Sequence, residues 1–161
     1  MDIKEMFLKQ KQVTHQGTLG VLGKIPPDRV GWRPAEGMLS LGQIVRHVWM
    51  SEEGLRRSAL EEKWDYYEQR IPRSLFSILG EVKFVEQDLV RMEEVHRETL
   101  RAAAAFPLER WEEERVNQEF NIRRKVFVML FGINEHQIHH RAQVGAYLHI
   151  LTGQRASPYL V

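Results

Sequence analysis

The chain has 161 residues, a hydrophobic fraction of 43%, a charged fraction of 28% and a formal net charge of +1. This length suits one domain with its own core, so we expect residues 1–161 to form a single domain. The balanced charge gives no reason to expect binding to nucleic acid or to a membrane surface. The chain contains no cysteine, which excludes disulfides, thiolate nucleophiles and cysteine-based metal sites.

No segment has the pattern of a targeting sequence or of a membrane span. The N-terminus lacks the basic start and apolar run of a signal peptide. The longest apolar run, Val126 to Ile133, is far shorter than the ~20 residues that cross a bilayer. We therefore expect a cytoplasmic protein, and the lack of cysteine fits a reducing compartment.

Apolar residues recur with a helical period through most of the chain, and no stretch shows the alternation or the Asn-Gly turn of a hairpin. The first helix is predicted over Ile3 to Leu22. It ends at Gly23 and the Pro26-Pro27 pair, because proline cannot continue a helix. A loop to about Leu39 is expected to follow.

The second helix is predicted from Ser40 to about Lys63. Ser40 and Gln43 have the spacing of a capping box, in which each side chain accepts a hydrogen bond from the backbone of the other residue. A loop is expected from Trp64 to Pro72, so the next helix should start only after it.

The third helix is predicted from about Ser74 to Ala105, where apolar residues step by three and four. A charged connector follows from Glu109 to Glu119, with room for one helical turn. The fourth helix is predicted from about Ile122 to Thr152, with Gly153 as its C-terminal cap. Four amphipathic helices predict an all-α four-helix bundle, whose long connections leave the order of the helices open.

The fourth helix carries two histidines within its apolar stripe. The stripe comprises Met129, Ile133, His136, His140, Val144 (or Gln143), Tyr147 and Leu151. Side chains four residues apart on a helix share one face, so both histidines should point toward the core. A buried polar ring without partners costs about 1–3 kcal/mol. The pair therefore needs either hydrogen-bond partners in the core or a shared divalent metal ion.

The other histidines rank below this pair as metal ligands. His47, beside apolar residues of the second helix, is the best third ligand, and an interfacial or surface position is the alternative. His15 and His96 lie in polar surroundings, where structural roles are favoured. His149 falls on the far side of the fourth helix from His136.

His139 has a spacing that permits ligation, but its own face of the fourth helix differs from the apolar stripe. That face carries Gly132, Glu135, Ala142 and Ala146. Small residues there indicate a close helix–helix contact, either inside the bundle or across a dimer. The stripe therefore favours His140 over His139.

Three histidine ligands would leave one coordination position of a divalent ion open. Such an ion could activate water for hydrolysis or hold a substrate thiolate. Glu135 and Gln143 are candidates for orienting the ligand rings, with ordinary polar helix positions as the alternative. The sequence lacks the His-Glu-x-x-His motif of metalloproteases, a phosphate-binding glycine loop and a nucleophile elbow.

Two segments resemble the DinB-like metal-binding four-helix bundles, a superfamily that includes bacillithiol transferases and mycothiol-dependent maleylpyruvate isomerases. They are the stretch from Trp32-Arg33-Pro34 to His47 and the stretch from His136 to Gln143. The second matches the family pattern His-x-x-x-His-Arg-Gly-Gln, with Ala142 in place of glycine.

The resemblance implies that His47, His136 and His140 are the metal ligands, with zinc, nickel or iron as the expected ion. It also implies that the second helix runs parallel to the third, and that the protein forms a homodimer. On this basis we expect a metal-dependent enzyme, such as a bacillithiol-type S-transferase that joins a small-molecule thiol to an electrophile. A metal-dependent hydrolase and a non-catalytic metal-binding stress-response dimer are the alternatives.

Overall fold

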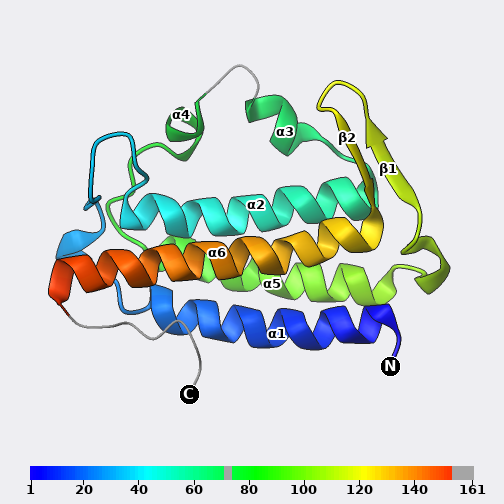
Figure 1. Cartoon of the computed structure of the whole chain (residues 1–161), viewed down its shortest axis with the longest axis horizontal. Helices are drawn as coiled ribbons and strands as arrows, with labels where there is room; N and C mark the ends of the chain where they lie inside the picture. The colour runs from blue at the N-terminus through cyan, green and yellow to red at the C-terminus, as the bar shows by residue number, and fades with distance from the viewer. Residues whose placement is uncertain (71–73, 154–161) are drawn as a thin grey trace.

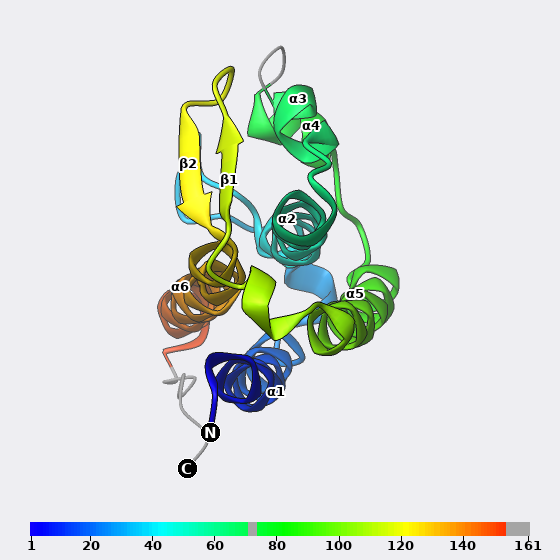
Figure 2. The same ribbon diagram turned by 90° about the vertical axis from the view of Figure 1, so that its right-hand side faces the viewer.

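The computed structural model describes residues 1–70 and 74–153, so the predicted loop end at Pro72 and the C-terminal tail lie outside the described residues. Four long helices form the body of the molecule (Figure 1). They are α1 (Ile3–Leu22), α2 (Leu41–Glu61), α5 (Glu86–Ala105) and α6 (Val126–Thr152). Viewed along the helices, α1 and α2 each contact both α5 and α6 (Figure 2). The predicted all-α bundle is confirmed.

The helix order is the one that the resemblance implies. α2 and α5 run in the same direction, while α1 and α6 run in the opposite one (Figure 1). The connection between α2 and α5 therefore has to return along the length of the bundle. Among the described residues, no helix is both long enough and apolar enough to cross a membrane.

The first two predicted helices form close to their predicted bounds. α1 covers the predicted residues, and the Asp2 side chain caps it by accepting a hydrogen bond from the Glu5 backbone. At the start of α2, Ser40 Oγ accepts from the Gln43 backbone at 3.2 Å. Gln43 Oε1 accepts from the Ser40 backbone at 3.0 Å. The predicted capping box is therefore present and fixes where α2 begins.

The prediction of one continuous third helix is wrong. A short α4 (Leu75–Leu79) ends at Gly80, and α5 begins only at Glu86. Gly80 has a φ of 61°, a backbone conformation that favours glycine. Val82 and Val85 lie in the connecting segment and are buried in the core, so their helix-like spacing arises from a non-helical stretch.

The segment after α2 also differs from the prediction. The expected loop contains a short helix, α3 (Asp65–Arg70). A 3-10 turn, η1 (Pro27–Arg29), lies in the earlier loop between α1 and α2. In Figure 1, α3 and α4 lie above α2, on the side of the bundle away from α1. These short helices therefore form an outer layer over α2.

The charged connector before α6 folds into a β-hairpin, which the sequence did not predict. After the 3-10 turn η2 (Leu108–Arg110), β1 (Glu114–Asn117) pairs antiparallel with β2 (Ile122–Lys125). α6 consequently begins at Val126, four residues later than predicted. The hairpin is mostly exposed and turns through Asn121 at a φ of 50°, without an Asn-Gly pair. Its strands show no apolar alternation and its turn contains no glycine, so the sequence lacks the usual signals of a hairpin.

Two apolar clusters fill the interior of the bundle. One surrounds Leu22, Ile44 and Val144, and the other surrounds Phe7 and Trp111. Along α1, α2, α5 and α6, buried polar residues occupy the positions between the two clusters. We call this set the inner polar layer, and it comprises Lys11, His15, Glu52, His96 and Gln137.

Candidate metal centre

The three histidines that the sequence singled out meet where α2 packs against α6. His47 comes from α2, and His136 and His140 come from successive turns of α6. His136 Nε2 lies 3.1 Å from His47 Nε2 and 3.1 Å from His140 Nε2. His47 and His140 are buried, while His136 is half-buried. The predicted residues therefore converge from two helices on one point.

The spacing of these nitrogens suits a divalent ion. Zinc binds imidazole nitrogens at about 2.0–2.1 Å, which places two ligands roughly 2.9–3.4 Å apart for octahedral to tetrahedral angles. Two of the three separations, at 3.1 Å, lie within this range, and all three ligand atoms lie within 4.8 Å of one another. In the described part of the chain, no carboxylate oxygen joins the three nitrogens as a further ligand. The triad could therefore hold a metal ion and leave coordination positions for other molecules.

A hydrogen bond fixes the tautomer of His140. His140 Nδ1 lies 2.8 Å from Gln143 Oε1, and Gln143 Nε2 donates to Tyr147 Oη at 3.0 Å. An amide oxygen only accepts, so His140 Nδ1 carries the proton and its Nε2 lone pair faces the other histidines. Burial, the main cause, lowers the pKa of His140 and favours this neutral form. The ring-orienting contact predicted for Gln143 is therefore present.

His47 is held from behind by a second chain of hydrogen bonds. Its Nδ1 lies 3.2 Å from Ser51 Oγ, which lies 2.6 Å from the hydroxyl of Tyr66 on α3. Gly54 makes this contact possible, because a methyl group there would collide with the Tyr66 ring. A serine oxygen can accept from Nδ1 while bonded to the tyrosine, which leaves His47 Nε2 free of a proton.

The donor set as a whole fits a cation. His140 presents an unprotonated Nε2 to the centre of the triad, and the Ser51 contact permits the same form of His47. Lone pairs that face a common point repel one another unless a proton or a positive ion lies between them. The contacts behind these two rings thus prepare the nitrogens for a metal.

The structure places the other candidate residues outside the triad. His139 is exposed on α6, and its neighbours Ala142 and Ala146 are exposed as well. The close contact predicted for this face therefore does not occur inside the bundle. Glu135 is also exposed, and His149 lies exposed near the end of α6.

Two histidines lie in the inner polar layer instead. The rings of His15 and His96 stack 3.7 Å apart with an interplanar angle of 3°. Beside them, Lys11 Nζ and Glu52 Oε2 form a buried ion pair at 3.0 Å. Burial lowers the pKa of His15 to about 2 and that of His96 to about 3. The layer was not predicted, because its members come from different helices and no spacing within one segment connects them.

The sequence did not predict roles for Ser51 and Tyr66. Ser51 lies four residues after His47, so helical spacing could have placed it beside the ligand. Tyr66 carries no such pattern, because its position depends on how α3 folds back over α2. Only the three-dimensional arrangement reveals that its hydroxyl supports the triad.

Comparison with known proteins gives the family of the chain and a structure of similar fold. Residues 11–144 match the sequence profile of the DinB superfamily. A crystal structure of a DinB-like protein from Bacillus subtilis is similar in fold, with a TM-score of 0.68 and 19% sequence identity. The similarity covers 99% of this chain and 96% of that protein. No curated protein sequence matches the chain.

Proposed function

The chain belongs to the DinB superfamily, and from this premise we propose that it is a metal-dependent enzyme. His47, His136 and His140 are the proposed ligands of one divalent ion. The observation that carries the proposal is the convergence of their Nε2 atoms, with His136 Nε2 3.1 Å from each of the other two. Gln143 and Ser51 hold the rings of His140 and His47 in the orientation that binding requires.

The reaction we propose is transfer of a small-molecule thiol to an electrophile. When bound, the ion supplies a Lewis acid that lowers the pKa of an incoming thiol or water. A thiol, with a pKa near 8.5, needs a far smaller shift to ionise than water, with a pKa near 15.7. In the described part of the chain, no carboxylate is grouped with the three histidines to act as a base. Ionisation of a thiol, which needs the smaller shift in pKa, is therefore favoured over ionisation of water. The chain has no cysteine, so the thiol must come from a substrate.

The experiment is a conjugation assay on the purified full chain before and after chelation. Bacillithiol and glutathione serve as thiols, and monochlorobimane serves as the electrophile. We expect conjugation that is lost on chelation and restored by adding back zinc, nickel or iron(II). His140→Ala should abolish the activity, whereas His149→Ala, an exposed change on the same helix, should leave it unchanged.

The same preparations distinguish the alternatives. Turnover of ester or amide substrates without thiol conjugation would replace the transferase with a hydrolase. Metal binding without turnover on either panel would favour a non-catalytic metal-binding protein. We also propose that the chain forms a homodimer, because the exposed Ala142 and Ala146 would let a second chain approach α6 closely. The mass of the native protein in solution tests this point.

A further inference from the structure

A pocket of about 350 Å³ lies between α2, α3, α6 and the β-hairpin. Pockets of this size accommodate small organic molecules. Its walls are largely apolar, formed by Leu55, Tyr67, Ile122, Val128 and Met129. Two charged residues, Arg124 and Glu135, also line it, and Gly132 forms part of its floor on α6. The pocket thus combines an apolar surface with two separate charges.

The pocket adjoins the triad on α2 and α6. On α6, His136 lies four residues after Gly132, on the same side of the helix and about 6 Å further along it. On α2, Leu55 lies four residues after Ser51, whose hydroxyl contacts His47. On α3, Tyr67 of the pocket directly follows the tyrosine that contacts Ser51. A molecule in the pocket would therefore extend toward the metal ligands.

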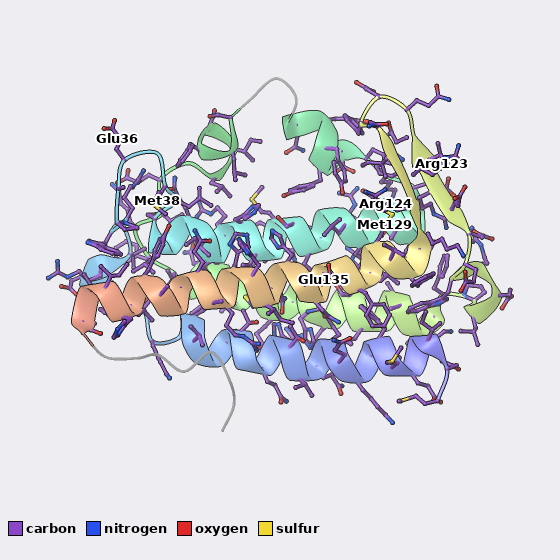
Figure 3. The ribbon with its side chains drawn as sticks, viewed as in Figure 1. Glu36, Met38, Arg123, Arg124, Met129 and Glu135 are labelled. Atoms are coloured by element: carbon purple, nitrogen blue, oxygen red, sulfur yellow. The ribbon has the colours of Figure 1, made fainter. Side chains whose placement is uncertain are left out.

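The hairpin directs Arg124 toward the bundle. Arg124 pairs with Arg115 across the strands, and directly paired residues point to the same side of a hairpin. Arg115 is buried, and its Nε donates to the backbone oxygen of Ala59 on α2 at 2.8 Å. Arg123 lies on the other side of the hairpin and pairs with Glu114 at 2.7 Å. Figure 3 shows Arg124 beside Met129, close to the start of α6.

Neither charge of the pocket is neutralised within the described part of the chain. Arg124 Nη1 donates only to the backbone oxygen of Arg123, at 2.9 Å, and no described carboxylate pairs with it. Glu135 likewise has no described cationic partner. Arg124 marks the hairpin end of the pocket, whereas Glu135 lies further along α6 (Figure 3). Glu135 directly precedes His136 in the sequence. The two ends of the pocket therefore carry opposite charges.

We propose that this pocket binds the electrophilic substrate, and that this substrate is an elongated apolar molecule with one anionic group. The anionic group binds Arg124, and the apolar body covers Leu55 and Met129. The opposite, reactive end lies beside His136. Glu135 repels an anionic group from that end, which fixes the orientation of the molecule. This assignment rests on the proposed function, because it takes the triad as the place of reaction.

The first test measures binding of 4-phenylbutanoate to the full chain by calorimetry. The neutral 4-phenylbutan-1-ol serves as the uncharged comparison, and each titration is repeated after chelation, so that binding to an ion is separated from binding to Arg124. Since hydrogen bonds to charged groups are the strong ones, we expect Arg124→Gln to weaken carboxylate binding by about tenfold or more. Arg123→Gln, the matched change on the outer side, should leave the affinity unchanged.

The second test fills the pocket from α6. A side chain at Gly132 would meet no atom within 4 Å at its Cβ, so Gly132→Leu should fold and occupy the pocket. The matched control is Gly20→Leu on α1, where a Cβ also meets no atom. We expect Gly132→Leu to abolish probe binding while keeping the metal content of the wild type.

Several results would overturn the assignment. In the first test, these results are a wild type that shows no saturable binding of 4-phenylbutanoate, a carboxylate affinity that Arg124→Gln and Arg123→Gln lower equally, and binding that chelation alone removes. In the second test, the result is a Gly132→Leu variant that binds the probe with the affinity of the wild type. The binding titrations on chelated protein need neither a metal nor turnover. If the proposed enzymatic function is wrong, these titrations can still show carboxylate binding that depends on Arg124. If the pocket assignment is wrong, they cannot.

Discussion

Two clusters of buried polar side chains lie near one another in this bundle, and each contains histidines. In the triad, the Nε2 atoms of His136 and His140 lie 3.1 Å apart, and the rings are tilted by 72°. In the inner polar layer, the rings of His15 and His96 lie parallel and stacked. Rings that meet at a steep angle can direct their nitrogen lone pairs at one point. The lone pairs of stacked rings lie in two parallel planes and do not meet. Burial of histidines alone therefore does not arrange ring nitrogens around a common point.

The surroundings of the two clusters differ as well. Each buried ring of the triad has a polar group behind it that leaves Nε2 for a ligand. The inner polar layer instead contains the Lys11–Glu52 ion pair, which Gln137 joins by donating to Glu52 at 2.6 Å. Gln137 directly follows His136, so this contact fixes the rotation of α6 that turns His136 toward α2. The inner polar layer supports the site without being part of it.

The largest effect should come from breaking the ion pair of the inner polar layer. Glu52→Ala leaves Lys11 buried without its partner, which costs about 3–5 kcal/mol. Urea unfolding should show a loss of this size, and Glu86→Ala, an exposed change on α5, should have little effect. If Glu52→Ala unfolds at the urea concentration of the wild type, the inner polar layer does not hold the bundle together.

A smaller effect is expected from pH. The pKa values of about 2 for His15 and about 3 for His96 in the folded chain lie below the ~6.5 of an unfolded histidine. The unfolded state therefore binds more protons between these values, and stability is retained above pH ~6.5 and lost as the pH falls. Each histidine contributes a slope of up to about 1.4 kcal/mol per pH unit.

The control is a variant that keeps a ring in the stack but removes one titrating group. His15→Phe should reduce the fall in unfolding free energy between pH 6.5 and pH 4.5. Metal-free protein is used for both chains, so that loss of an ion does not contribute. An unchanged slope would show that His15 is protonated as easily in the folded chain as in the unfolded one.

The smallest effects concern the residues behind the triad. Loss of a group that orients a metal ligand typically lowers metal affinity by about 10–100-fold. Gln143→Leu should therefore weaken binding of zinc within this range, and Tyr66→Phe should weaken it less, because Tyr66 acts through Ser51. Competition with a chromogenic chelator measures both affinities, with Gln12→Leu on α1 as the control. Equal affinities in all four proteins would contradict the positioning roles.

The sequence was informative where short-range patterns determine the structure. The α2 cap depends on Ser40 and Gln43, which are three residues apart, and the His136–His140 pair depends on one turn of helix. The break at Gly80 was hidden because Val82 and Val85 keep a helix-like spacing while filling the core from a non-helical segment. Local pattern thus found two of the three histidines of the triad and ranked His47 as the best third candidate, and the family resemblance chose the same set.

The inner polar layer shows why the rest was not predicted. Lys11 lies among polar neighbours on α1, and such a residue is usually solvated. Its partner Glu52 is on another helix, so no spacing within one segment connects them. The contact between Ser51 and Tyr66 likewise depends on the position of α3. Contacts between elements distant in sequence leave no periodic pattern in either element.

Converging ring nitrogens, rather than the burial of histidines, define the proposed metal site. The most direct test measures divalent metal per chain in the wild type, His136→Ala and His15→Phe, after loading and removal of free ion. We predict about one ion per chain in the wild type and in His15→Phe, and none in His136→Ala. A wild type without metal, or an ion that is lost in His15→Phe and kept in His136→Ala, would contradict the claim.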